Sequence, residues 1–189
     1  MRNRWRLSFN SPVILSFAML CFVATVLNYV TGGKSNTLLF MTYHSSLKQP
    51  LTYLRFFTHV LGHSGWEHLI GNMTYILLLG PMLEEKYGPG RILGIIALTA
   101  VVTGVVNYVF FPNVALCGAS GVVFAFILLV SFTGFDDGTI PITFILVAIL
   151  FGGQQIYEGL ILQDNVSNLA HILGGVVGAF WGYFLNRRR

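Results

Sequence analysis

The chain has 189 residues, of which 54% are hydrophobic and only 10% are charged, with a formal net charge of +4. A soluble domain usually carries about 25% charged residues, so this chain cannot cover itself with polar surface and the bilayer is its expected solvent. The basic residues form no stripe away from the expected membrane ends, which argues against nucleic-acid binding. The two cysteines, Cys21 and Cys117, are too few for a disulfide framework.

Six apolar stretches follow one another along the chain, each near the roughly 17–25 residues that a helix needs to cross a bilayer. The predicted spans are residues 12–31, 68–83, 92–111, 119–133, 140–156 and 168–185. Turn-forming residues separate them, as in TGGKSN, EEKYGPGR and FDDGT. The first span is longer than the apolar part of a signal peptide and shows no convincing cleavage site. We therefore predict an all-α membrane protein, a compact six-transmembrane-helix bundle that forms one domain over residues 1–189.

The basic residues set the expected orientation, because cytoplasmic loops carry an excess of Lys and Arg. With six spans, both ends lie on one side, and that side holds eight of the basic residues: Arg2, Arg4, Arg6, Lys86, Arg91, Arg187, Arg188 and Arg189. The other side holds Lys34, Lys48 and Arg55. Both termini are thus expected in the cytoplasm, and the partly apolar segment 32–67 is expected to lie as an outer loop in the interface.

Polar residues of the second, fourth and sixth spans should meet at one depth, because these spans run in the same direction. His68 and Asn72 start the second span, Ser120 starts the fourth, and His171 lies one turn into the sixth. Each has an ordinary structural alternative, since a membrane serine often caps a helix and a histidine near a helix end often only packs. Ionisable groups within spans are nevertheless costly and tend to mark function.

These residue types together indicate acyl transfer. A serine hydroxyl is a weak nucleophile that needs a base, and His171 is the only histidine in the last three spans. The acidic residues expected in the loops, Asp136, Asp137, Glu158 and Asp164, lie at other depths. The pattern therefore predicts a Ser–His dyad without a third member.

The developing oxyanion would need hydrogen-bond donors. His68 and Asn72 are four residues apart on one helix face, and both can donate, as can the backbone N–H of Ser120 at a helix start. Gly118 and Gly121 would let backbone and substrate approach closely.

The sixth span carries a ladder of small residues, Gly174, Gly178 and Gly182, with Gly175 beside it. Such a ladder lets two membrane helices approach closely, and general packing is its commonest meaning. Here it begins one turn after His171, so close packing on the fourth span would set the distance between His171 and Ser120.

Four motifs in this sequence are similar to those of a known family: GASG (118–121), HLIGN (68–72), AHILGGVVG (170–178) and LEEKYG (83–88). In this order, on these spans, they resemble the rhomboid intramembrane serine proteases in their six-span bacterial form. The resemblance implies Ser120 as nucleophile, His171 as general base, and His68 and Asn72 supporting the oxyanion. It also implies a cavity open to the outside, a mobile fifth helix that admits substrate, single-span membrane proteins as substrates, and a bacterial inner membrane.

Two positions depart from the family pattern. Many members have Trp-Arg in the first loop where this chain has Leu54-Arg55. Many have a tyrosine four residues after the serine, stacked on the catalytic histidine, where this chain has Phe124. The ring of Phe124 can still stack, but its position lacks the hydroxyl.

Three other functions are compatible with parts of the sequence. A catalytically inactive rhomboid-like binding protein usually lacks the serine or the histidine, and both are present here. A metalloprotein could use His59, His63 and His68, but the glutamate of a zinc-binding HExxH helix is absent, so His59 and His63 are expected to bond loop backbone. A transporter would need a charged residue within a span. We predict an enzyme that needs no metal and no cofactor.

Overall fold

The computed structural model describes residues 9–134, 141–161 and 165–186. Within these ranges the chain is helical, without a β-strand beyond an isolated bridge between Thr42 and Leu116. The long helices are α1 (Pro12–Val30), α3 (Trp66–Tyr87), α4 (Pro89–Phe110), α5 (Ser120–Ser131), α6 (Ile142–Ile161) and α7 (Asn165–Asn186). The predicted all-α membrane bundle is confirmed.

Three of the described segments are long and apolar enough to cross a membrane: α1, α4 and residues Asn168–Asn186 of α7. Helix α5 is equally apolar but shorter, with 12 residues, and a 3-10 turn at Phe132–Gly134 follows it. Helix α3 overlaps the predicted second span and carries the polar residues that the sequence analysis placed there. The division into six spans and one domain stays a prediction.

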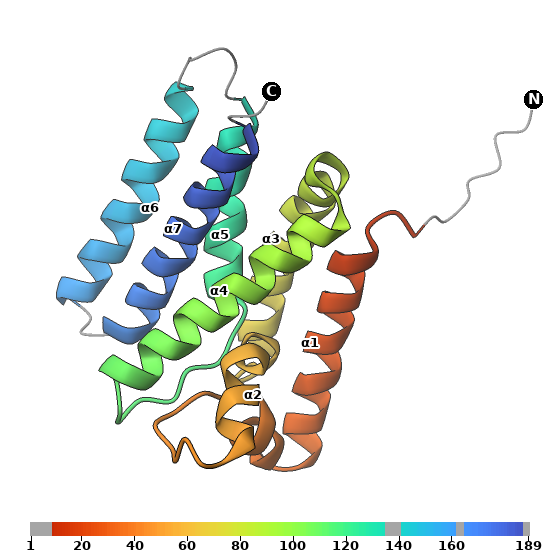
Figure 1. Cartoon of the computed structure of the whole chain (residues 1–189), viewed down its shortest axis with the longest axis vertical. Helices are drawn as coiled ribbons and strands as arrows, with labels where there is room; N and C mark the ends of the chain where they lie inside the picture. Colours follow the sequence, from red (N-terminus) through yellow and green to blue (C-terminus); the bar gives the residue numbers. More distant parts are fainter. Residues whose placement is uncertain (1–8, 135–140, 162–164, 187–189) are drawn as a thin grey trace, which may run out of the picture.

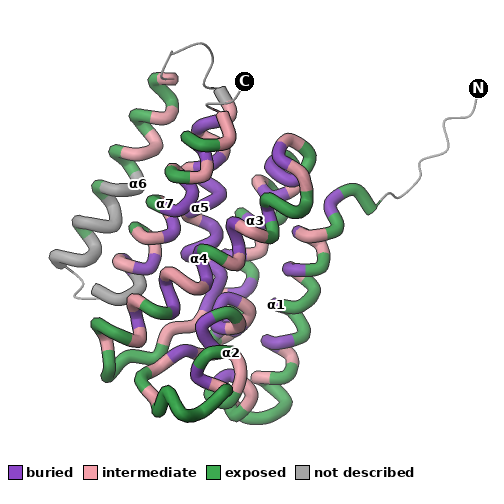
Figure 2. The backbone as a smooth tube through the Cα atoms, viewed as in Figure 1, coloured by how far each residue is buried: buried purple, intermediate pink, exposed green. Residues whose placement is uncertain are grey.

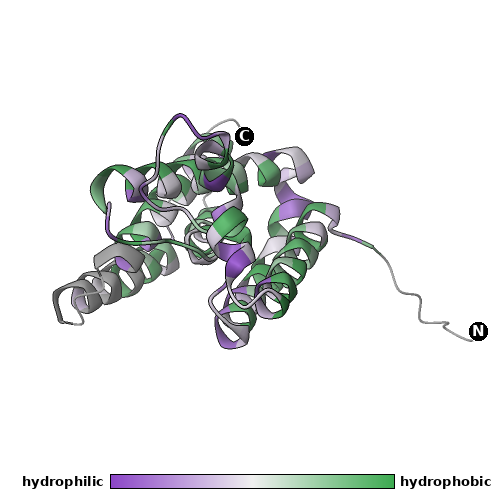
Figure 3. Ribbon diagram, turned by 90° about the horizontal axis from the view of Figure 1, so that it is seen from below, coloured by the Kyte–Doolittle hydropathy of each residue, from purple (hydrophilic) through white to green (hydrophobic). Residues whose placement is uncertain are grey.

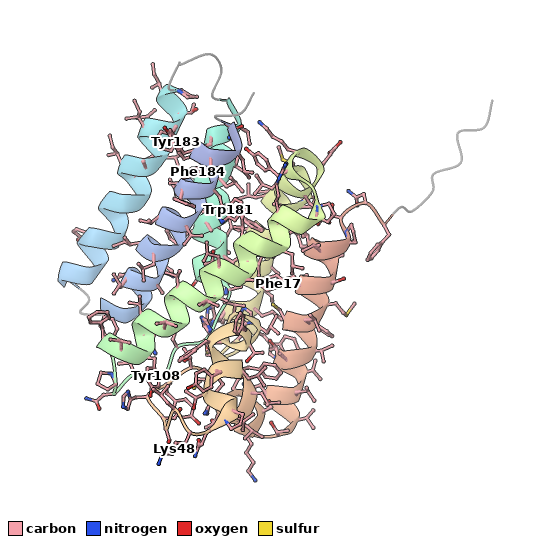
Figure 4. All side chains as sticks on the ribbon, viewed as in Figure 1. Phe17, Lys48, Tyr108, Trp181, Tyr183 and Phe184 are labelled. Atoms are coloured by element: carbon pink, nitrogen blue, oxygen red, sulfur yellow. The ribbon has the colours of Figure 1, made fainter. Side chains whose placement is uncertain are left out.

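The long helices pack side by side and form a bundle (Figure 1). Helices α1 and α3 lie on one side, α5 and α7 on the other, α6 at the edge beyond α7, and α4 crosses obliquely over the middle. The start of α1 and the end of α7 lie at the same end. At the opposite end lies the segment between α1 and α3, so that Lys48 sits far from Tyr183 and Phe184 (Figure 4). This arrangement is the one that the alternation of spans predicts.

Helix boundaries differ from the prediction where α3 meets α4. The segment EEKYGPGR was expected to be a break, but α3 continues through Tyr87 and α4 begins at Pro89. A single residue, Gly88, makes the turn with φ 86°, a conformation that glycine adopts without strain. Helix α6 likewise runs to Ile161, so Glu158 lies in its last turn and not in a loop. The predicted loop residues Asp136, Asp137 and Asp164 lie outside the described residues.

Glu84 lies in the part of α3 that extends past the predicted boundary. Its buried carboxylate accepts hydrogen bonds from the backbone N–H groups of Val13 and Ile14, at 3.0 Å each. These N–H groups belong to the first turn of α1 and have no partner within that helix. A carboxylate there also complements the positive end of the helix dipole. Glu84 therefore joins α1 to α3 at the end of the bundle that holds the start of α1.

The core is centred on α5, most of whose residues are buried (Figure 2). Hydrophobic residues predominate along much of the helical ribbon (Figure 3), and many large apolar side chains are exposed. Met19, Leu78 and Phe110, for example, are more than half exposed. A soluble protein avoids such a surface, whereas lipid tails solvate it. The burial pattern thus fits a bundle in a bilayer.

The segment between α1 and α3, which the sequence analysis predicts to be the first outer loop, contains a π-turn (Asn36–Phe40), helix α2 (Pro50–Thr58) and a 3-10 turn (His59–Leu61). Arg55 organises it from within. Although only 3% exposed, its guanidinium donates to the hydroxyl of Tyr43 and approaches the hydroxyl of Ser45, and it lies over the Tyr43 ring. These acceptors compensate the burial of the Arg55 charge. Arg55 is therefore satisfied in this loop, although Leu54 stands where many family members have a tryptophan.

Candidate active site

Ser120 is the first residue of α5, where its backbone N–H has no partner within the helix. The residues before it approach the helix in an unusual conformation, since Gly118 has φ 128°. The N–H of Gly118 donates to the carbonyl of His59 at 2.9 Å. The loop that leads to Ser120 is therefore fixed to the first outer loop.

His68 and Asn72 of α3 face this loop, as their spacing predicted. A Cβ atom placed on Gly118 would lie 2.6 Å from Cε1 and 2.8 Å from Nε2 of His68, and 3.7 Å from Nδ2 of Asn72. Any side chain at position 118 would therefore displace His68, and the close approach of this ring explains the first glycine of GASG. Nε2 of His68 and Nδ2 of Asn72 therefore both lie near the same position beside Gly118.

The side-chain nitrogen of Asn72 is one of several buried polar atoms without a hydrogen-bond partner among the described residues. Asn72 as a whole is 7% exposed. A buried amide N–H that lacks an acceptor costs free energy, so such a group calls for an explanation. A donor kept for an oxygen atom of a bound substrate would provide one.

His171 of α7 lies against α5. Its ring stacks on Phe124 with 4.3 Å between centroids and 7° between planes, so the predicted stacking survives without a tyrosine. Phe124 is four residues, about one turn, after Ser120 on the same helix. A Cβ atom on Gly121 would lie 3.4 Å from the carbonyl oxygen of Ala170. The chain neighbours of Ser120 and of His171 are thus in contact, and the two helices bring these residues to one region.

The glycine ladder of α7 packs on α5, and this helix pair is the most extensively packed in the described part of the chain. A Cβ on Gly174 would lie 2.9 Å from Cα of Gly121, and one on Gly178 would lie 2.7 Å from Cα of Ala125, with the carbonyl oxygens closer still. Gly182 similarly meets Phe132. Gly175, in contrast, meets only the side chain of Leu128 at 3.7 Å.

His59 and His63 bond loop backbone, as expected. Nδ1 of His59 lies 3.1 Å from the carbonyl of Arg55, and Nδ1 of His63 lies 3.1 Å from the carbonyl of Leu61. Burial lowers the pKa of each histidine to about 4. Within the described residues, no group of three or more His, Cys, Asp or Glu side chains could hold a metal ion.

One contact at the site was not found from the sequence. The hydroxyl of Ser64 lies 3.1 Å from Nδ1 of His68. Ser64 precedes α3 and is separated from His68 by four positions, the spacing of neighbours on a helix face. Because Ser64 lies before the helix, this spacing does not by itself place the two side chains together, and the contact depends on the path of the chain before α3.

Comparison with known proteins decides the family. A model of the rhomboid domain matches residues 50–188, most of the chain. The chain belongs to the rhomboid family. It is 37% identical over 139 residues to Rhomboid-related protein 1 of Caenorhabditis elegans and 29% identical over 158 residues to Rhomboid-related protein 2 of the mouse. It is 28% identical over 184 residues to the rhomboid protease GlpG of Haemophilus influenzae.

The coverage differs among these rhomboids. The matches take in 68%, 72% and 94% of this chain, respectively, for the worm, mouse and Haemophilus proteins. They span 39% of the worm protein, 52% of the mouse protein and 91% of the bacterial protease. The chain therefore corresponds to part of the animal rhomboids and to nearly all of the bacterial one.

Proposed function

We propose that this rhomboid is an intramembrane serine endopeptidase in which Ser120 is the nucleophile and His171 the general base. The observation that carries the proposal is the stacking of His171 on Phe124, one turn after Ser120. This contact holds the imidazole beside the helix that begins with the serine. The glycine contacts between α5 and α7 support it, because they keep the two helices at close approach.

The chemistry follows from these roles. The Ser120 hydroxyl attacks a peptide carbonyl while His171 accepts its proton, and the same proton then passes to the leaving amine. A water molecule next hydrolyses the acyl-enzyme ester, again with His171 as the base. A dyad of this kind requires neither metal nor cofactor.

The oxyanion of each tetrahedral intermediate would be bound by three donors: Nε2 of His68, Nδ2 of Asn72 and the backbone N–H of Ser120. The unpartnered Nδ2 of Asn72 supports this assignment, as does the convergence of His68 and Asn72 beside Gly118. Gly118 leaves space beside His68 and Asn72 in which the scissile carbonyl would lie, whereas Gly121 allows α7 to approach α5 at Ala170 and Gly174.

The expected substrate is a single-span membrane protein that reaches the site laterally from the lipid. A continuous helix hides its carbonyls in i→i−4 bonds, so the segment must unwind, which is easier near Gly or Pro. With both termini in the cytoplasm of a bacterial inner membrane, the site would lie near the outer boundary. We expect cleavage there, at a small residue such as Ala or Gly.

Purified protein incubated with a set of single-span proteins tests this proposal. Wild-type protein should release products whose masses locate the cut near the outer boundary, and folded Ser120→Ala should release none. Wild-type cleavage rates in Ser120→Ala would refute the dyad. Cuts clustered at the cytoplasmic end, or cleavage indifferent to a Phe in place of the small residue, would refute the account of the substrate.

A further inference from the structure

The two ring nitrogens of His68 have different surroundings. Nδ1 lies 3.1 Å from the hydroxyl oxygen of Ser64, whereas Nε2 faces the loop at Gly118, where a Cβ atom would lie within 4 Å of both Nε2 and Nδ2 of Asn72. Among the described residues, Ser64 is the one whose polar side-chain atom bonds a ring nitrogen of His68. One nitrogen is therefore held by the protein and the other is directed to the proposed oxyanion position.

A neutral imidazole carries one proton, and its tautomer decides which nitrogen can donate. To stabilise an oxyanion, His68 must carry the proton on Nε2, which leaves Nδ1 as an acceptor. A serine hydroxyl can donate to Nδ1 in that tautomer. The same hydroxyl could accept from a protonated Nδ1, so the contact fits both tautomers. The need for a donor at Nε2 is what favours the form in which Ser64 donates.

The neighbouring His63 does not compete for this role. Its ring meets that of His68 edge to face, with 5.0 Å between centroids. Because its Nδ1 bonds the carbonyl of Leu61, which only accepts, the proton of neutral His63 is on Nδ1. Burial lowers the pKa of His63 to about 4, so at neutral pH it places no positive charge beside His68.

We propose that Ser64 is a positioning residue whose hydroxyl donates to Nδ1 of His68 and thereby keeps the His68 proton on Nε2. This inference rests on the proposed function, because it assigns a purpose to the tautomer of an oxyanion donor. Ser64 itself lies outside α3 and is exposed, so its replacement removes one hydroxyl without opening a cavity in the core.

Nitrogen NMR of the imidazole rings tests the tautomer directly, in detergent at a pH where His68 is neutral. The chain has five histidines, so single His→Gln variants can assign the ring signals. We expect wild-type His68 to be protonated on Nε2 and Ser64→Ala to shift it towards a mixture. Turnover should fall about two- to tenfold, the range for loss of one hydrogen bond. Ser64→Thr, which retains the hydroxyl, should restore both properties.

Ser46→Ala is the matched control, since Ser46 is an exposed serine of the same outer loop without a contact to His68. It should change neither the ring signals nor turnover. A wild-type His68 protonated on Nδ1, or ring signals that are unchanged in Ser64→Ala, would overturn the proposal. The same spectra can be recorded in the Ser120→Ala background. If Ser120→Ala still cleaves, the proposed function is wrong. The NMR spectra test the His68 tautomer independently of that result.

Discussion

Two pairs of histidines in this molecule have different environments. His59 and His63 lie in the first outer loop, buried, with Nδ1 of each ring bonded to a backbone carbonyl. His68 and His171 lie on α3 and α7 beside the two ends of the segment from Gly118 to Phe124, and each is partly exposed. The first pair stabilises a loop, whereas the second pair faces the region where α5 begins.

The comparison shows that residue type alone does not identify a functional histidine. All four lie near the same end of the bundle, and HVLGH has the spacing of a metal site. What separates the pairs is the backbone bond at Nδ1, which His59 and His63 make and His68 does not, and the position of His68 and His171 beside Gly118 and Phe124. The predictions below test that separation.

Among the variants that test this comparison, the largest effect, smaller than that of Ser120→Ala, is expected at the proposed oxyanion donors. His68→Ala and Asn72→Ala should each lower turnover by about 10²–10³, because removal of one such donor costs roughly 3–4 kcal/mol of transition-state stabilisation. His44→Ala is the control, since His44 is an exposed outer-loop histidine that contacts Tyr108. Steady-state kinetics would measure the losses. Equal loss in all three variants, with lowered melting temperatures, would show that His68 and Asn72 act through stability and not as oxyanion donors.

The next effect concerns the α5–α7 contact that holds His171. Gly174→Ala places a methyl group against Gly121 and should cost about 1–3 kcal/mol, the usual range for overpacking, with loss of activity. Gly175→Ala meets only a leucine side chain at 3.7 Å and should be tolerated. Thermal melts and cleavage assays of both variants would check this. Similar melting temperatures for the two variants would contradict the role of the ladder.

Acid should destabilise the fold because it protonates the buried histidines His59 and His63. His59 and His63 have pKa values near 4 in the fold, compared with an ordinary 6.5, so the unfolded chain takes up protons that the fold excludes. Their contribution to stability is present above pH 6.5 and is lost as the pH falls towards 4, by up to about 1.4 kcal/mol per pH unit for each histidine. Melting curves at pH 7, 5.5 and 4 would show it. His59→Gln should flatten the dependence, and a melting temperature that rises on acidification would contradict the assignment.

The smallest expected effect concerns metal. Activity should survive EDTA and 1,10-phenanthroline, because each proposed step uses only side chains, backbone and water. Inhibition that added zinc reverses would contradict this and would give His59, His63 and His68 a shared role.

Much of this architecture could be predicted from the sequence, for physical reasons. Apolar stretches of membrane length give the helices, and their alternating direction brings Ser120, His68 and His171 to one end. The helix ends at Tyr87 and Ile161 were misjudged, because turn residues do not show that Glu84 bonds the start of α1 or that a helix continues beyond the apolar core. Nor could the sequence show the contact of Ser64, which depends on the path of the chain before α3.

The central claim is that Ser120 is a nucleophile activated at the start of α5, and covalent labelling tests it most directly. A fluorophosphonate probe should modify the wild-type protein in detergent, and peptide mass spectrometry should place the label on Ser120. Folded His171→Ala should label far more slowly, since the hydroxyl then lacks its base. A label located on another residue, or equal labelling rates for wild type and His171→Ala, would contradict the account.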